Sequence, residues 1–206
     1  MAILLQSASS QYLAGFSDTP PTNVTMCFWI KPTAIGALQE IWNYTVKYQV
    51  SLLSTGYIEN KIWDTKGFSS TSALTAGLWY HVVCTRDSGG NAATFINGVA
   101  AGTNTGHDNS PGTSSFVIGA YNYGNCALED FRTYSRVLSL NEIQTLYACC
   151  GADGIQDDLT YWWIFNDGPL GTTVSTVYGQ RGIGNLTANG SPVYTEGIVK
   201  WRRAYN

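Results

Sequence analysis

The stretch "DFRTYSRVLSLNEIQTLYA" (Asp130–Ala148) passes from a strand pattern to a helix pattern. Phe131 to Tyr134 is typical of the end of a β-strand. Ser139 is a favourable N-cap, and Glu142, three residues later, completes a capping box. The apolar residues that would share one helical face are Leu140, Ile143, Leu146 and Tyr147. Because such a face must pack on apolar surface, we predict a short helix near 139–148 that closes the open end of a β-sandwich.

Strand patterns dominate the rest of the chain. The run "VTMCFWIKP" (Val24–Pro32) alternates between two faces, as a strand in a sheet requires. Turn residues separate it from similar runs at about the 8–12-residue spacing that is typical of a sandwich or barrel. In "TFINGVAAG", Asn97 and Gly98 suit a type I′ hairpin turn because both tolerate positive φ. The sequence therefore predicts an all-β fold with one short helix.

Composition excludes several function classes. Of the 206 residues only 12% are charged, and the net charge is −3, which argues against a nucleic-acid partner. No apolar run reaches transmembrane length, so no membrane role is expected. The start, "MAILLQSASSQYLAGF", lacks the basic and long apolar regions of a secretory signal. Either the protein does not cross a membrane by the usual route, or its leader has been removed.

Cysteine and histidine usage gives no sign of a metal centre or a nucleophile. The five cysteines form an odd set without metal-ligand spacing, which favours free thiols in a reducing compartment. The chain has two histidines, His81 and His107, and no nucleophile elbow. We expect His81 to pack within a strand, and we expect no zinc site.

Several motifs occur in the order "QYL", "MCFWIKP", "LWYHVVCTRD", "FINGV", "FVIGAY" and "LEDFRTYSRVLSLNEIQTLY". In this order they closely resemble the laminin-G-like domains of the concanavalin A-like lectin/glucanase superfamily. The resemblance implies a two-sheet antiparallel jelly-roll sandwich. It makes residues 1–148 a laminin-G-like core within a single domain spanning 1–206.

The remainder resembles the same family in an unusual position. After a connection at 149–158, the segment 159–195 is similar to the "W-x-F-D/E-G … G-x-L-T" part that usually opens such domains. A circular permutation would let it complete this sandwich, whereas a swapped arrangement would pair it with a neighbouring subunit. Residues 196–206 form a basic tail. Chains that end in this way resemble proteins of bacteriophage and related viral genomes.

The superfamily resemblance also suggests chemistry to look for. Its jelly-roll glycosidases carry Glu-x-Asp-x-Glu on one strand, and this chain has no such triplet. Glu129 and Asp130 are adjacent, so a regular strand would point them to opposite faces. We therefore expect no enzymatic activity. Calcium, which relatives bind through loop oxygens, would draw on a set of five residues, although capping of turns is the preferred role for them. The five are Asp18, Asp108, Asn109, Glu129 and Asp130.

Glycan binding would need exposed aromatic rings next to amides. Two stretches supply them, "GAYNYGN" and "IWNY". The candidate ligand-binding residues are Tyr121, Asn122, Tyr123, Asn125, Trp42 and Tyr44. Core packing or subunit contact is the alternative for each ring, and we prefer it.

Two functions follow from these features. The first is a non-enzymatic structural or interaction protein, namely a phage virion surface protein that decorates or cements a capsid. It would form homo-oligomers, contact capsid or other assembly proteins and assemble in the host cytoplasm. The alternative is a carbohydrate-binding lectin-like module of a bacterial or extracellular protein. We prefer the first, with a glycan as a further partner and without a required cofactor.

Overall fold

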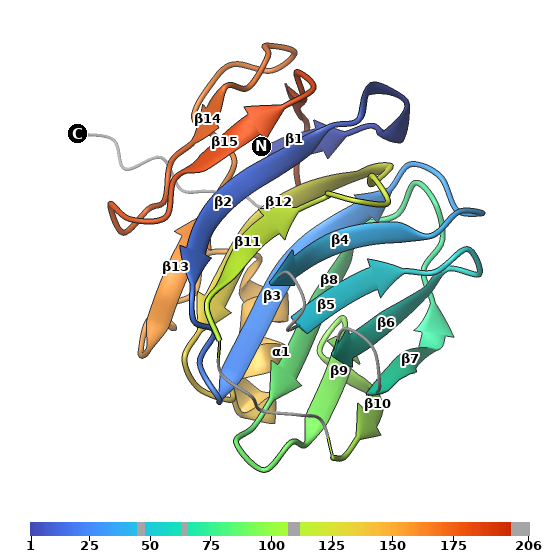
Figure 1. Cartoon of the computed structure of the whole chain (residues 1–206), viewed down its shortest axis with the longest axis vertical. Coiled ribbons are helices and arrows are strands. Elements are labelled where there is room, and N and C mark those ends of the chain that lie inside the picture. Colours follow the sequence, from blue (N-terminus) through green and yellow to red (C-terminus); the bar gives the residue numbers. More distant parts are fainter. Residues whose placement is uncertain (45–47, 63–65, 107–111, 199–206) are drawn as a thin grey trace.

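A computed structural model describes residues 1–44, 48–62, 66–106 and 112–198. Within these residues, two antiparallel sheets of eight strands each stack as a sandwich (Figure 1). Sheet A has the order β10-β9-β8-β3-β12-β1-β16, and β13 also pairs with β12. Sheet B has the order β14-β15-β2-β11-β4-β5-β6-β7. The predicted two-sheet antiparallel jelly roll is confirmed.

The strand bounds are as follows. Sheet A consists of β1 (Ala2–Leu5), β3 (Val24–Pro32), β8 (Tyr80–Arg86), β9 (Ala92–Ile96), β10 (Val99–Asn104), β12 (Cys126–Tyr134), β13 (Leu159–Trp163) and β16 (Val193–Thr195). Sheet B consists of β2 (Tyr12–Asp18), β4 (Gln39–Tyr44), β5 (Tyr48–Leu52), β6 (Tyr57–Ile62), β7 (Lys66–Ala73), β11 (Ser114–Ile118), β14 (Thr176–Val177) and β15 (Leu186–Asn189). The helices are a 3-10 turn, η1 (Ser7–Ser9), and α1 (Leu140–Cys149).

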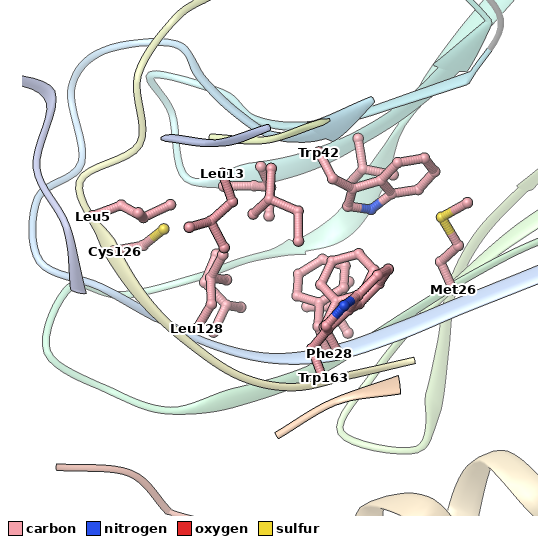
Figure 2. Close-up of a cluster of buried hydrophobic side chains, with 14 of the residues drawn as sticks. Leu5, Leu13, Met26, Phe28, Trp42, Cys126, Leu128 and Trp163 are labelled. Carbon is pink, nitrogen blue, oxygen red and sulfur yellow. The ribbon is translucent and has the colours of Figure 1, made fainter. Parts of the chain in front are cut away.

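The core fills the space between the sheets with alternate residues of each strand. Trp42 and Phe116 from sheet B meet Phe131 and Trp163 from sheet A, and all four are fully buried. The rings of Phe116 and Trp163 stack with centroids 5.3 Å apart. Figure 2 shows Trp42 and Trp163 within this cluster. Each such side chain contributes about 1.5–3 kcal/mol by leaving water, so the core fixes which face of each strand points outward.

The helix lies where the sequence predicts it. Ser139 is its N-cap, and the capping box with Glu142 is present. Its buried residues Ile143 and Leu146, however, pack with Cys27 on the outer face of sheet A. The prediction that the helix closes the open end between the sheets is therefore wrong. The reason is that β3 is buried on both faces, so its outer face also needs an apolar cover.

Two further observations concern one hairpin turn and the length of the helices. Asn97 and Gly98 have φ of 53° and 75°, which confirms a hairpin turn built on positive φ. No helix among the described residues has the length and apolar character needed to cross a membrane.

The segment 159–195 lies in the chain's own sheets. β13 pairs with β12, β15 pairs with β2, and β16 pairs with β1. In Figure 1 the strands β14 and β15 form one side of the front sheet, next to β2. In this structure the segment is therefore part of the chain's own sandwich.

Candidate functional site

A pocket of about 260 Å³ opens on the outer face of sheet B, where β11 ends. We call it the tyrosine pocket, and its lining residues are Tyr12, Val117, Ala120, Tyr121 and Tyr123. The rings of Tyr12 and Tyr123 have centroids 6.2 Å apart and are tilted by 39°. Tyr121 is 55% exposed, so aromatic surface faces solvent beside a hollow. Such a combination is typical of a small-ligand site.

Strand alternation brings these residues together. In β2 the side chain of Leu13 is in the core, so its neighbour Tyr12 points outward. In β11 Phe116 and Ile118 are in the core, and Val117 points outward in the same way. β11 pairs with β2, so the two outward faces are adjacent.

The chain then turns sharply to place the other two tyrosines. Gly119 has a φ of +78°, and a Cβ added there would lie 2.6 Å from the Leu5 side chain, so glycine suits both the turn and the space. Tyr121 also has a positive φ, 63°, which is uncommon for a residue with a large side chain. Such strain persists only where surrounding contacts hold the backbone.

Those contacts come from β4. The Gly119 backbone N donates to the Ile41 carbonyl at 2.9 Å, and the Glu40 backbone N donates to the Asn122 carbonyl at 2.8 Å. The Asn122 side chain donates from Nδ2 to Glu40 Oε1 at 3.1 Å, and Asn43 Nδ2 donates to Glu40 Oε2 at 2.9 Å. Residues 119–125, here called the tyrosine loop, are therefore fixed before any ligand arrives, which lowers the entropic cost of binding.

Asn125 has a structural part in this loop. Its backbone N donates to Gln39 Oε1 at 2.7 Å, and its side chain makes two bonds with Ser7. Because both ends of its amide are engaged within the chain, Asn125 is not available to a ligand in this structure. Of the predicted glycan residues, the structure brings Tyr121 and Tyr123 into one pocket, with Asn122 between them in the chain.

Trp42 and Tyr44 do not belong to this site. Both are core residues with 0% and 2% exposure, so they have the core-packing role that we preferred for them and cannot offer their rings to a glycan. The physical reason is their place in β4, where Trp42 pairs with Val50 on one side and Ile118 on the other. Tyr12 is the site residue that sequence reasoning missed. Its signal was its alternation with Leu13, but only the pairing of β2 with β11 shows its neighbours.

The predicted calcium ligands do not converge. Asp18 accepts from the Tyr161 hydroxyl at 2.9 Å on sheet B, whereas Glu129 and Asp130 lie on sheet A. Asp108 and Asn109 lie outside the described residues. In the part of the chain that the structure describes, no cluster of three or more His, Cys, Asp or Glu could hold a metal.

Protein donors occupy the two carboxylates on β12. Glu129 accepts from the Met1 ammonium at 2.9 Å and from the Ile198 backbone N at 2.7 Å. A register shift between Glu129 and Arg132, with Asp130 at a φ of 48°, forms a β-bulge. A bulge puts two successive side chains on the same side, and both carboxylates bond to groups on the outer face. The prediction that Glu129 and Asp130 point to opposite faces is therefore wrong.

Asp130 takes part in a buried ion cluster on sheet A, here called the arginine clamp (Asp130, Arg132 and Asp153). Arg132 donates from Nε and Nη2 to Asp130 at 2.8 and 2.9 Å and from Nη1 to Asp153 at 2.8 Å. Trp162 Nε1 donates to Asp130 at 2.7 Å. Burial raises the pKa of Asp130, and Arg132 opposes that rise. The clamp ties the connection after α1 to the sheet.

His81 is also buried on this outer face. Its ring centroid lies 5.1 Å from that of Trp29 and 6.3 Å from that of Tyr147. Burial, followed by the charge of Arg132, lowers the pKa of His81 to about 3, so the imidazole is neutral. It acts as a packing group, as the sequence suggested.

Comparison with known proteins places this fold in a family. The family model of the concanavalin A-like lectin/glucanases superfamily matches residues 6–144, which include the whole tyrosine pocket. The chain belongs to this superfamily. No curated protein matches the chain.

Solved structures show how far the superfamily fold extends. A candidate carbohydrate-binding protein from Bacteroides ovatus is 16% identical with a TM-score of 0.75 and covers 94% of this chain. The chain spans 61% of that protein's length. A heptameric SAP-like pentraxin from Limulus polyphemus is 19% identical with a TM-score of 0.61, covering 90% of this chain and 94% of its own. A sialidase from Trypanosoma rangeli, 16% identical with a TM-score of 0.51, shares the fold over 61% of this chain and 22% of its own.

Proposed function

We propose that this chain is a carbohydrate-binding, lectin-like protein that holds a sugar ring in the tyrosine pocket. The observation that carries the proposal is the group of three tyrosines, Tyr12, Tyr121 and Tyr123, around one pocket of about 260 Å³. The apolar face of a sugar ring can pack on an aromatic ring, while hydroxyl groups bond to phenols and amides. The preformed tyrosine loop spares the cost of ordering these groups on binding.

The comparison with the Bacteroides ovatus protein supports this proposal at the level of fold. That likeness covers most of this chain, but the two proteins share few residues. Support for a sugar ligand therefore has to come from the pocket itself, because one fold can serve many functions.

The decisive experiment is a glycan array followed by calorimetry on the best ligand. Tyr121→Ala and Tyr123→Ala should each weaken binding at least tenfold, which corresponds to about 1.4 kcal/mol. Tyr178→Ala is the matched control, since Tyr178 is 56% exposed and lies in the C-terminal segment. A silent array, or an equal loss in the control variant, would overturn the proposal.

The proposal has two further parts. The protein binds sugars without cleaving them, and this binding does not require calcium. Glycans that bind should be recovered uncleaved, and their affinity should be the same with calcium and with a chelator. Release of shorter sugars would identify an enzyme. Loss of affinity in chelator would identify a metal-dependent lectin.

Assembly on a phage virion, with capsid partners in the host cytoplasm, stays a prediction. The pentraxin from Limulus polyphemus is heptameric, so this fold also occurs in an oligomer. Light scattering on the purified protein tests for a homo-oligomer, and co-sedimentation with capsids tests the capsid partner. A monomer that does not sediment with capsids would contradict this role while leaving sugar binding untouched.

A further inference from the structure

A buried carboxylate next to the tyrosine loop, Glu40, has no positively charged partner among the residues that the structure describes. Glu40 is 4% exposed, and its oxygens accept from the side-chain amides of Asn122 and Asn43. None of the ion pairs among the described residues involves Glu40. Amide donors stabilise a buried carboxylate but do not cancel its charge. Asp130, on the opposite sheet, is equally buried but is paired with Arg132.

The same hydrogen bonds orient two amide oxygens. A carboxylate can only accept, so Nδ2 of Asn122 must face Glu40, and its Oδ1 must face away from it. Asn122 is exposed, so that oxygen is open to solvent between two pocket tyrosines. Asn43 is held the same way, and its buried Oδ1 has no hydrogen-bond partner. The negative charge of Glu40 and the negative end of the Asn122 amide dipole are therefore both at the tyrosine loop.

The residues that line the tyrosine pocket add to the negative electrostatic potential. None of its five residues carries a charge, and three are tyrosines, whose ring faces have a negative quadrupole. Cations bind over such faces, with an attraction that grows as water is excluded. The pocket thus combines an attractive surface for cations with a nearby uncompensated negative charge.

We propose that the tyrosine pocket selects sugars by charge, preferring amino sugars that carry a free ammonium group over neutral sugars and rejecting acidic sugars. This inference rests on the proposed sugar-binding function and gives it a substrate class. The ammonium group would lie over a tyrosine face and donate to Asn122 Oδ1, in the field of Glu40. A carboxylate at the same place would meet a like charge without a cation to neutralise it.

The test compares positively charged, neutral and negatively charged ligands that are built on the same sugar ring. Calorimetry compares methyl glucosaminide, methyl glucoside and methyl glucuronide, and the three galactose counterparts, at a pH where the amine is protonated. The amino sugar should bind roughly tenfold tighter than the neutral sugar of its series, and the acidic sugar should bind more weakly than either. The preference should shrink in about 0.5 M salt, while affinity for the neutral sugar stays constant.

Outcomes separate the two proposals. If neutral glycans bind but affinity does not follow the charge of the ligand, the charge inference is wrong and sugar binding stands. If neither these ligands nor an array glycan binds, both are wrong. Acidic sugars that bind best would also overturn the inference.

A variant pair locates the source of the preference. Glu40→Gln should reduce the preference for the amino sugar, because it removes the negative charge at nearly constant size and leaves the tyrosine faces in place. Glu59→Gln is the control, since Glu59 faces outward from β6 on the same sheet and pairs with Lys61 at 3.4 Å. The amide introduced by Glu40→Gln would also present a donor to one of the two asparagine side chains, which can shift the loop. The salt dependence of the unmodified protein tests the inference without that complication.

Discussion

The two outer faces of this sandwich handle buried charge in different ways. On sheet A, α1 and the connection after it cover the strands, and Asp130 is paired with Arg132 beneath that cover. On sheet B, Glu40 is buried without a cationic partner in the described part of the chain, and the tyrosine pocket is open beside it. The comparison indicates that one face is completed by the chain itself. The other face has the open pocket in which we propose that a sugar binds.

The largest expected loss of stability comes from a substitution on the outer face of sheet A, which α1 and the following connection cover. Arg132→Ala would leave Asp130 and Asp153 buried and close together without their cation, at a cost of about 3–5 kcal/mol in the free energy of unfolding. Arg132 itself keeps its charge, because Asp130 and Asp153 more than offset the lowering of its pKa by burial. Urea unfolding measures the loss.

The control for this variant is Arg136→Ala. Arg136 also pairs with a carboxylate, Glu142, but both side chains are partly exposed. Its removal should cost about 1 kcal/mol or less. Equal losses in the two variants would show that the arginine clamp is no different from a surface pair. A change in sugar affinity with Arg132→Ala, in conditions where the variant is folded, would show that the two faces are coupled.

The next largest expected effect is a pH dependence of stability, and it comes from His81 on the same outer face of sheet A. Because the pKa of His81 is lowered to about 3 in the folded state, its contribution to stability is fully present above the unfolded value of 6.5 and is lost as pH falls below it. Between about pH 7 and pH 4 this loss amounts to about 3 kcal/mol. His81→Phe, which can stack between Trp29 and Tyr147, should remove it. Parallel stability curves for the two proteins over this range would contradict the burial of a neutral imidazole.

Local sequence signals predicted local structure well. Ser139 and Glu142 lie three residues apart, and their capping box is present. Asn97 and Gly98 are adjacent, and their turn has the expected positive φ. Such features depend on the chain's own backbone over a few residues, so they survive any tertiary arrangement.

Features that depend on distant pairing could not be predicted in the same way. The stretch that contains Trp42 left open whether its ring is exposed or in the core, and only the pairing of β4 with β5 and β11 shows that it faces the core. Tyr12 joins Tyr121 because β2 and β11, about a hundred residues apart in sequence, are neighbours. The β-bulge turns the Asp130 side chain to the face opposite to the one that strand alternation predicts. The sequence pattern of a strand contains no signal for such a bulge. Register between strands is the information that a single sequence lacks.

A smaller stability effect is expected on the open face. Gly119→Ala adds a Cβ at a φ of +78° that would lie 2.6 Å from the Leu5 side chain, so strain and crowding should together cost about 2 kcal/mol. Its effect on function should be larger, because the displaced tyrosine loop weakens sugar binding. Gly77→Ala is the matched control, with a φ of +84° and nothing within 4 Å of an added Cβ. If both variants bind sugar like the unmodified protein, the loop does not position the site.

The smallest expected effect tests whether the cover of sheet A is separable from the site. Ser139→Ala removes the side-chain acceptor of the Glu142 backbone N and should cost about 1 kcal/mol. Glu142 keeps its bond to Arg136, which is the main reason that its pKa is lowered to about 2. The stability from that bond is present above the unfolded pKa of 4.5 and declines as pH falls toward 2, in the variant as in the unmodified protein. Hydrogen exchange should show faster opening of α1 alone, because the tyrosine loop takes its support from β4. Faster exchange at residues 119–125 would mean that the helix stabilises both faces, and the contrast between them would then be one of degree.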